Sequence, residues 1–314
     1  MLVLWILLIL LAIYLIFIAA PAIVSSAAIF SRRDWTDFET LLRPDYQFAP
    51  YADQLREANH AVLQLPASVV ETVAVDGIPL RADYYDLHGE RTVIFLHGYR
   101  SNPMVNFSVQ AASFSRRGYN LLIVHQRAHG ESGGACPTLG LKEQTDLLRW
   151  VDWVKNETGI PRIVIYGMSM GAATAAYASN KLNASVVQAM ILDCGYTSAY
   201  EQIALDCRRR HMPTAMMMPV IRLYVKLRCG VDLRNSVTQA LSETKIPAFF
   251  IHGTADRTVP YSVGRANYDS CCSRKAFFTA EGIGHTMSFP AKLGAAEHAL
   301  FQFLSEECPS GLPD

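Results

Sequence analysis

The segment Gly167-Met168-Ser169-Met170-Gly171 holds one serine between two glycines. A β-branched apolar run at 162–166 precedes it and an alanine-rich run at 170–181 follows, so we expect a strand, a sharp turn and a helix. In such a turn the serine backbone is strained, and only residues without a side chain fit two positions to either side. We therefore expect the Ser169 hydroxyl to stand above a sheet as a nucleophile, with the free N–H of Met170 beside it.

A serine hydroxyl is a poor nucleophile until a base takes its proton, and two later segments carry a base and a carboxylate. Asp256 lies in IHGTADRTVP (251–260), and His285 lies in EGIGHTMSF (281–289). A histidine can act as the base when a carboxylate fixes its tautomer and stabilises the imidazolium. Because all three residues are expected in loops that follow strands, we expect Ser169, Asp256 and His285 to meet at one edge of a sheet as a catalytic triad.

An oxyanion hole would need two backbone N–H groups that point at the same place. His97-Gly98-Tyr99 ends an apolar run, and the glycine lets the chain turn sharply there. The N–H of Tyr99 can then point at the same spot as the N–H of Met170, and losing one such donor typically costs about 3 kcal/mol of barrier. We expect these two N–H groups to form the oxyanion hole, and His97 to support the loop rather than to transfer protons.

The elements that must position these residues alternate along the chain. Continuous apolar runs are TVIFLH (92–97), NLLIVH (120–125), RIVIYG (162–167), QAMILD (188–193) and AFFIHG (248–253). Helical patterns occupy 104–117, 141–158, 170–181, 198–228, 261–271 and 291–305. Buried strands that alternate with helices predict an α/β fold, a mostly parallel twisted sheet with helices on both faces. An antiparallel hairpin at 69–85, with its turn at Asp76-Gly77, is expected to precede it.

The N-terminal region differs from the rest of the chain. Residues 1–31 contain no Asp, Glu, Lys or Arg, and Met1–Ala20 is wholly apolar. Twenty residues of α-helix rise about 30 Å, enough to cross a bilayer. No basic residue precedes the run, which exceeds the apolar core of about 7–15 residues in a cleavable signal peptide. We expect a retained transmembrane anchor at 1–30. Arg32 and Arg33 favour a cytoplasmic location for the domain beyond this anchor, with an extracytoplasmic location as the alternative.

The remaining composition is that of a globular domain without a polyanionic partner. The 28 Lys and Arg residues balance the 28 Asp and Glu residues, so charge gives no argument for nucleic acid. The seven cysteines are odd in number and lack metal-type spacing, which is typical of reduced, structural thiols. We expect a juxtamembrane helical segment at 31–68 and one domain at 69–308, with a short helical cap at about 196–240.

With these motifs together, the chain resembles the α/β-hydrolase superfamily. It is most similar to the branch grouped with serine aminopeptidases and monoacylglycerol-lipase-like hydrolases, often bacterial and membrane-anchored. FLHGY, GMSMG, LDCGYTS, PAFFIHGTADRTVP and GIGHTMSF carry the resemblance, over roughly residues 69–305. It implies an acyl-serine intermediate on Ser169, with Asp256 as the acid and His285 as the base, and no cofactor or metal. Some relatives use a carboxylate after an earlier strand, which makes Asp193 the alternative acid.

One segment departs from the family pattern. Relatives usually carry Asp-x-Arg-(Gly)-His-Gly-x-Ser after the second parallel strand, whereas this chain reads HQRAHGES at 125–132, with His125 in place of the aspartate. In relatives this stretch braces a loop. The resemblance therefore implies a structural role for Arg127, His129 and Ser132.

The cap carries the residues that would contact a substrate. Its methionines offer a flexible apolar surface that either receives an aliphatic chain or packs on the domain core; they are Met212, Met216, Met217 and Met218. The basic run Arg208-Arg209-Arg210-His211 is a solvated face that could also meet anionic lipid headgroups.

These expectations define one leading function and two alternatives. The leading function is a serine hydrolase of carboxylic esters, with lipid-like or small acyl substrates, a membrane contact through the N-terminal helix and no required protein partner. A peptidase, amidase or thioesterase would use the same triad. A non-catalytic, membrane-tethered binding protein on the same fold is the third reading.

Overall fold

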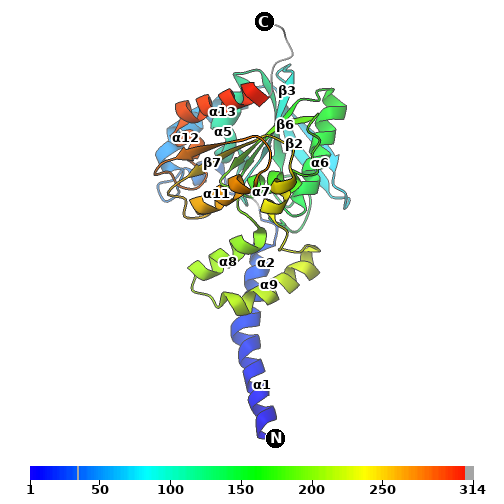
Figure 1. Ribbon diagram of the computed structural model, residues 1–314, viewed down its shortest axis with the longest axis vertical. Helices are drawn as coiled ribbons and strands as arrows, with labels where there is room; N and C mark the ends of the chain where they lie inside the picture. The colour runs from blue at the N-terminus through cyan, green and yellow to red at the C-terminus, as the bar shows by residue number, and fades with distance from the viewer. Residues whose placement is uncertain (34, 308–314) are drawn as a thin grey trace.

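The computed structural model describes residues 1–33 and 35–307 and contains an eight-stranded sheet with the order β1-β2-β4-β3-β5-β6-β7-β8 (Figure 1). The strands are β1 (Ala67–Val73), β2 (Pro79–Tyr85), β3 (Arg91–Leu96), β4 (Tyr119–His125), β5 (Ile163–Met168), β6 (Val187–Asp193), β7 (Ala248–Gly253) and β8 (Lys275–Ala280). β1 and β2 pair antiparallel, as do β2 and β4, and every later pair is parallel. The mostly parallel α/β sheet expected from the sequence is confirmed.

The apolar runs and the hairpin correspond to strands. All five runs form β3 to β7, and Gly77 takes a φ of +79° in the turn between β1 and β2. β8 was not among the predicted runs. It is an edge strand with half-buried side chains, so it lacks the continuous β-branched character of strands covered on both faces.

Two apolar cores fill the two faces of the sheet, because successive side chains of a strand point to opposite faces. In β3, Ile94 and Leu96 belong to one core, and Val93 and Phe95 belong to the other. The first core includes α6 (Glu143–Trp153), α7 (Met170–Ala178), α10 (Val237–Glu243) and α11 (Tyr261–Ser270). The second includes α5 (Pro103–Ser115), α12 (Ser288–Ala291) and α13 (Leu293–Glu307). The sheet is thus a rigid platform for the loops at its edge.

The segment after the N-terminal helix packs on this second core. It contains α3 (Phe38–Leu41), a 3₁₀ turn (Ala49–Tyr51) and α4 (Ala52–Leu63), and α4 lies against α5. Its Leu42, Leu55 and Val62 side chains are buried in that core. Within the helical segment expected at 31–68, α4 therefore covers one side of the sheet platform.

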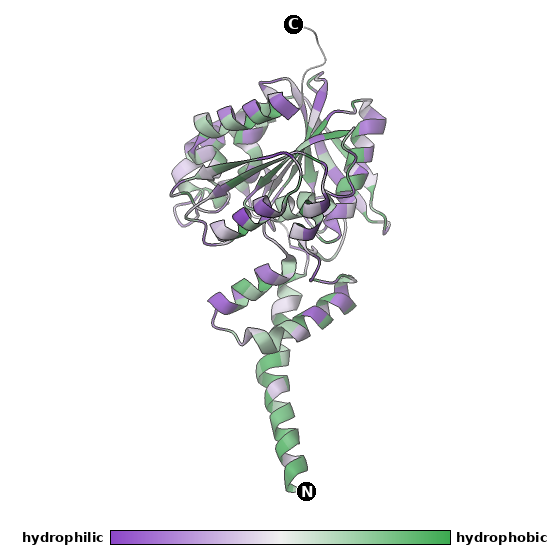
Figure 2. Ribbon diagram, in the orientation of Figure 1, coloured by the Kyte–Doolittle hydropathy of each residue, from purple (hydrophilic) through white to green (hydrophobic). Residues whose placement is uncertain are grey.

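The N-terminal helix extends away from the sheet (Figure 1). It consists of α1 (Leu2–Tyr14), a π-helical turn (Leu15–Ala19) and α2 (Ala20–Ile29). Among the described residues, Leu2–Ile29 is the helix long and apolar enough to cross a membrane, and Figure 2 shows its hydrophobic character. Pro21 cannot donate a backbone hydrogen bond to residue 17 and its ring crowds that carbonyl, which explains the wider turn before it.

Two cap helices flank the end of this N-terminal helix. They are α8 (Ala199–Arg209) and α9 (Thr214–Cys229), with α2 between them in Figure 1. The helical region expected at 198–228 is divided at residues 210–213, where His211 has a φ of +55° and Pro213 precedes α9. The buried side chains of Ala22 and Phe30 join the same core as α9. The cap thus sits where the N-terminal helix meets the sheet domain.

Candidate active site

The turn between β5 and α7 explains the two glycines around Ser169. A Cβ atom on Gly167 would lie 2.3 Å from the carbonyl oxygen of Gly171, and one on Gly171 would lie 1.7 Å from that of Leu96. Neither position can hold a side chain, because strand and helix approach too closely. Ser169 takes the strained φ of +52° and ψ of −110°, as expected for a residue at the tip of such a turn.

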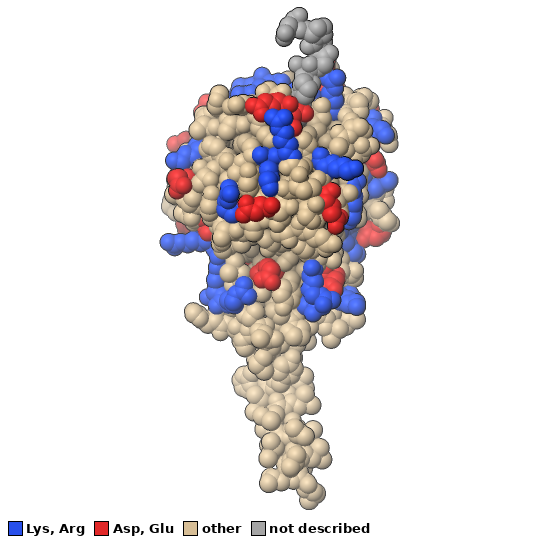
Figure 3. All heavy atoms as spheres, in the orientation of Figure 1, with Lys and Arg blue, Asp and Glu red and all other residues tan. Residues whose placement is uncertain are grey.

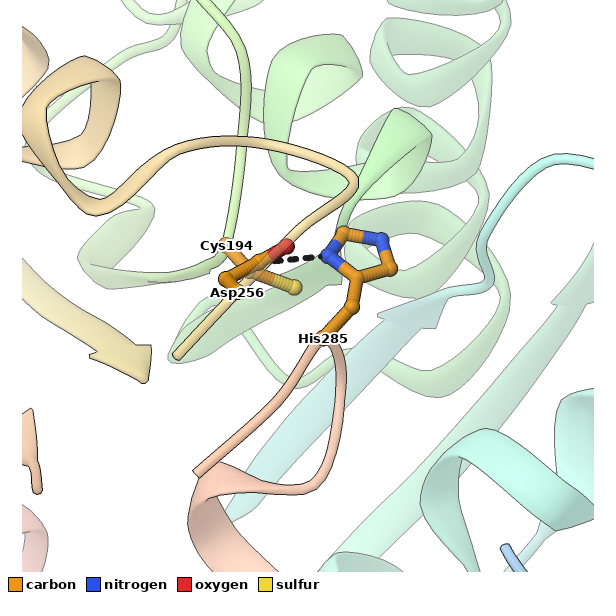
Figure 4. Close-up of side chains that lie close together, drawn as sticks. All are labelled: Cys194, Asp256 and His285. Carbon is orange, nitrogen blue, oxygen red and sulfur yellow. Dashed lines mark hydrogen bonds and ion pairs between the residues drawn. The ribbon is translucent and has the colours of Figure 1, made fainter. Parts of the chain in front are cut away.

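The structure brings together the three side chains that the sequence singles out. Ser169 Oγ lies 3.0 Å from His285 Nε2, and His285 Nδ1 lies 2.6 Å from Asp256 Oδ2. Figure 4 shows the His285 ring beside the Asp256 carboxylate, with the two residues on separate loops. Because an ionised carboxylate only accepts, His285 Nδ1 carries a proton and Nε2 is free to accept the Ser169 hydroxyl proton.

The Asp256 carboxylate is held by donors on both of its oxygens. Oδ1 accepts the backbone N–H groups of Thr258 and Val259, at 2.8 and 2.9 Å. Oδ2 faces His285 and also His252, whose Nε2 is 3.2 Å away. Burial alone would raise the pKa of Asp256, but the hydrogen bonds from His252 and His285 outweigh it and hold this pKa below its usual range. The carboxylate is therefore ionised at neutral pH.

His252 was not identified from the sequence. Its ring is buried at the end of β7, four residues before Asp256, and its Nε2 also lies 2.9 Å from the carbonyl oxygen of Val259. Gly264 leaves room for it, since a Cβ there would be 2.1 Å from His252 Nδ1. The sequence does place a histidine four residues before Asp256, in the segment HGTAD. A histidine at the end of an apolar strand, however, cannot be distinguished from an ordinary buried residue by sequence alone.

Asp193, the alternative acid, has other partners. Within the described residues no hydrogen bond joins it to His285; its Oδ2 accepts from the Tyr166 hydroxyl at 3.3 Å, and its carbonyl oxygen accepts from the N–H of Ser169 at 2.8 Å. Burial raises the pKa of Asp193 to about 7. Asp193 thus holds the backbone of the nucleophile turn, and the geometry favours Asp256 as the partner of His285.

Cys194 completes a compact group with Asp256 and His285, in which potential metal-ligand atoms lie within 4.8 Å of one another (Figure 4). A cysteine ligand must be a thiolate, yet burial, together with the nearby charge of Asp193, raises the pKa of the Cys194 thiol far above its usual range. The Asp256 oxygens are already occupied by four donors. The donor set therefore fits a hydrogen-bonded triad better than a metal centre.

The loop after β3 lies against the nucleophile. A Cβ on Gly98 would be 3.7 Å from the Cβ of Ser169, and the N–H of Gly98 donates to Asn106 Oδ1 at 2.9 Å. Tyr99 follows Gly98 directly, and Met170 is the first residue of α7. Met170 thus follows Ser169 directly and Tyr99 is one residue beyond the loop position that approaches Ser169. The first N–H groups of a helix have no partner within it.

His97 supports this loop, as expected. Its Nδ1 donates to the carbonyl oxygen of Gly98 at 2.7 Å, and its Nε2 accepts the N–H of Gln126 at 3.2 Å. Complete burial lowers the pKa of His97 well below its usual value, so the ring is neutral. A neutral ring with both nitrogens occupied has no proton-transfer site left.

The segment at 125–132, which differs from the family pattern, braces the region around the loop after β3. Arg127 is buried and bonds Asp146 through two nitrogens, each at 2.6 Å. His129 Nε2 accepts the N–H of Arg100 at 3.1 Å, and the Ser132 hydroxyl donates to the carbonyl oxygen of His125 at 2.5 Å. The structural role expected for Arg127, His129 and Ser132 is confirmed.

Comparison with known proteins agrees with this fold. The chain belongs to the α/β-hydrolase superfamily: the family model described as the alpha/beta hydrolase fold matches residues 91–213. The uncharacterized protein YqkD of Bacillus subtilis (strain 168) is 30% identical over 216 residues, which cover 68% of this chain and 70% of YqkD. The lysophosphatidylserine lipase ABHD12 of Danio rerio is 22% identical over 71% of this chain, and the match spans only 57% of that protein.

Solved structures share the fold at low sequence identity. The Pyrococcus furiosus esterase Pf2001 superposes with a TM-score of 0.64 at 23% identity, covering 78% of this chain and 92% of the esterase. A puromycin-hydrolyzing peptidase of Mycobacterium tuberculosis superposes with a TM-score of 0.60 at 16% identity, covering 79% of this chain and 40% of the peptidase. The fold of this chain is therefore that of a hydrolase.

Proposed function

We propose that this protein is a serine hydrolase that cleaves carboxylic esters, with lipid-like or small acyl substrates. The observation that carries the proposal is the continuous hydrogen-bond chain from Ser169 through His285 to Asp256, at 3.0 and 2.6 Å. The strained backbone of Ser169 supports it, because strain of this kind is typical of functional sites. A non-catalytic binding protein would need none of these features.

In the proposed first step, Ser169 Oγ attacks the ester carbonyl carbon while His285 Nε2 takes the hydroxyl proton. Asp256 stays ionised and stabilises the imidazolium, and the N–H groups of Tyr99 and Met170 donate to the tetrahedral oxyanion. The bond to the alcohol then breaks, and the alcohol leaves with the proton from His285. A water molecule that the same imidazole deprotonates hydrolyses the acyl-serine and regenerates the hydroxyl.

The ester preference rests on similarity and on the N-terminal helix. An esterase and a lysophosphatidylserine lipase are among the similar proteins. In this proposal the N-terminal helix anchors the enzyme in a membrane, with the catalytic domain on the cytoplasmic side because Arg32 and Arg33 come directly after the span. Amide or thioester hydrolysis with the same triad is the second candidate, since a puromycin-hydrolyzing peptidase shares the fold.

A substrate panel tests the proposal. The full-length protein is assayed with p-nitrophenyl esters of increasing chain length, acyl thioesters and aminoacyl-anilides, beside Ser169→Ala. We expect the esters to have the highest kcat/KM and Ser169→Ala to lose nearly all turnover. Faster hydrolysis of the anilides would assign the protein to the peptidases, and equal turnover by wild type and Ser169→Ala would refute the serine mechanism.

A further inference from the structure

A cavity of about 480 Å³ lies between the N-terminal helix, the two cap helices and the loop after β3. Its walls are mainly apolar; they include Ile29, Ile203, Cys207, Met212, Met217 and Ile221. The volume is within the range of about 300–1,000 Å³ that small-molecule sites occupy, and such sites are lined predominantly by apolar side chains. The chemistry of the walls suits an alkyl chain.

The cavity and the candidate catalytic residues share the loop after β3, which carries Gly98 and Tyr99. Tyr99 lines the cavity, its N–H is a proposed oxyanion donor, and a Cβ on the preceding Gly98 would be 3.7 Å from the Cβ of Ser169. An acyl group whose carbonyl lies at Ser169 can therefore place its chain against Tyr99 and continue between the cap helices.

The N-terminal helix holds the loop that carries Tyr99. The Tyr99 hydroxyl donates to the carbonyl oxygen of Ile29 at 2.6 Å, and the Arg100 guanidinium donates to the carbonyl oxygens of Ala28 and Ser31, the latter at 2.9 Å. The last carbonyls of a helix have no partner within it, so the loop satisfies the end of α2. The end of α2 and the loop after β3 that carries Tyr99 therefore form one hydrogen-bonded unit.

Positively charged side chains predominate around the cavity. Arg33, Arg100 and Arg210 border it, with Asp206 as the acidic residue of the lining. Arg33 and Arg210 are exposed, so their guanidinium groups are available to a ligand from solvent or from a membrane surface. A ligand with an alkyl chain and an anionic group fits apolar walls with a net positive border.

The cavity lies where the apolar helix leaves the protein. The α9 side chains Met216, Leu223 and Leu227 are exposed and spaced seven and four residues apart, so they share one face. Lys and Arg side chains gather over the cap in Figure 3, and the helix beyond it carries no charge. The level of the cap therefore suits the boundary between the hydrocarbon core of a bilayer and its headgroups.

We propose that residues 25–33, at the end of the N-terminal helix, form one wall of the substrate site, and that the cavity binds the alkyl chain of an anionic single-chain amphiphile from the membrane. The guanidinium groups of Arg33 and Arg210 bind the anionic group. This inference rests on the proposed function and assigns the N-terminal helix a part in substrate binding as well as in anchoring.

A matched pair of substitutions on the helix tests the wall. Ala28 lines the cavity, whereas its neighbour Ala27 is also exposed but does not line it. In full-length protein in nanodiscs, we compare kcat/KM for 1-palmitoyl-lysophosphatidylglycerol with kcat/KM for p-nitrophenyl acetate. We expect Ala28→Trp to lower this ratio at least tenfold and Ala27→Trp to leave it within twofold. Equal ratios in the two variants would overturn the proposal.

A second pair tests the anionic group. Arg210, the residue that follows α8, borders the cavity, whereas Arg208 in the last turn of α8 does not. We compare 1-palmitoyl-lysophosphatidylglycerol with neutral 1-palmitoylglycerol, which has the same chain. We expect wild type and Arg208→Gln to prefer the anionic substrate and Arg210→Gln to lose at least fivefold of that preference. The same preference in both variants would refute the claim that Arg210 binds the anionic group.

A binding experiment separates this inference from the proposed reaction. Ser169→Ala protein in nanodiscs is irradiated with lysophosphatidylglycerol that carries a diazirine on its acyl chain, and labelled peptides are mapped by mass spectrometry. We expect labels within residues 25–33 and 203–221, lost in the Ala28→Trp double variant and kept with Ala27→Trp. Labelling of these residues with no hydrolysis by wild type would refute the proposed reaction alone. Hydrolysis without such labelling would refute the binding of the acyl chain in the cavity.

Discussion

At the scale of single residues, the two oxygens of Asp256 have separate tasks. Oδ1 closes its own loop on the N–H groups of Thr258 and Val259, and Oδ2 faces His252 and His285. The carboxylate is therefore oriented even without His285. In the proposed mechanism this fixed orientation sets the tautomer of the base, which is why the identity of the acid is worth testing.

The first prediction compares the two candidate acids. Asp256→Asn keeps the shape of the side chain but favours the wrong tautomer of His285, so kcat should fall toward about 10⁴-fold. Asp193→Asn should change kcat little, because Asp193 bonds Tyr166 rather than His285. Steady-state hydrolysis of one p-nitrophenyl ester measures both. A harmless Asp256→Asn together with a damaging Asp193→Asn would reverse the assignment.

The second prediction concerns the pH dependence of stability. Burial raises the pKa of Asp193 to about 7, above the value of about 3.9 in an unfolded chain. A raised folded-state pKa gives stability that is complete below pH 4 and is lost as pH rises toward 7. The free energy of unfolding of wild type, relative to Asp193→Asn, should therefore decrease from pH 4 to pH 7. Denaturant titrations across this range measure it, and an increase would mean that Asp193 ionises readily.

The residues of the candidate triad could be predicted because each follows a strand in a motif with glycines nearby. His252 and Cys194 were not identified, since their proximity to Asp256 comes from packing, and in the sequence each resembles an ordinary buried residue at the end of a strand. The bonds from Tyr99 and Arg100 to the helix end were also unpredictable, because they join side chains to backbone carbonyls about seventy positions away.

At the scale of elements, the turn between β5 and α7 depends on close approach of backbone to backbone. The Gly171 position is the tightest, because a Cβ atom there would lie 1.7 Å from the Leu96 carbonyl oxygen. Backbone atoms cannot move aside as a flexible side chain can. The turn therefore requires glycine for reasons of packing as well as of conformation.

A glycine pair provides the third prediction. Gly171→Ala should lower the free energy of unfolding by about 3 kcal/mol or more, because the added methyl overpacks the strand–helix contact. Gly294→Ala, in α13, is the matched control: nothing lies within 4 Å of its Cβ position, and alanine favours a helix. Thermal unfolding should show a loss for the first and no loss for the second. Equal melting temperatures would contradict the geometry of the turn.

Strands β3 to β7 were predictable because burial on both faces requires continuous apolar runs. The edge strand β8 was not, since its side chains are half-buried. The helix break at 210–213 does have a signal in the sequence, because Pro213 cannot continue a helix. Periodicity thus locates elements inside the sheet better than elements at its edge or above it.

At the scale of the whole molecule, the N-terminal helix has two parts. Residues 2–13 extend from the protein with exposed side chains, whereas Ala22, Ser26 and Phe30 are buried against the cap and the sheet domain (Figure 1). The first part suits a membrane, and the second is part of the folded domain. A sequence that is apolar throughout does not reveal this division.

The fourth prediction comes from that division. In detergent, deletion of residues 2–13, whose side chains are all exposed, should leave the melting temperature and ester hydrolysis close to those of the full chain. Deletion of residues 2–31 removes buried side chains and the carbonyls that hold Tyr99 and Arg100, so both quantities should fall. Equal behaviour of the two deletions would show that the helix end is a passive tether.

The central claim is that Ser169 becomes nucleophilic because His285 deprotonates it. A fluorophosphonate probe, combined with peptide mass spectrometry, tests this claim most directly. We predict one phosphonylated serine, Ser169, in the folded wild type, and at least a hundredfold slower labelling in folded His285→Ala. A folded wild-type protein that stays unlabelled, or that is labelled at the same rate without His285, would contradict the account.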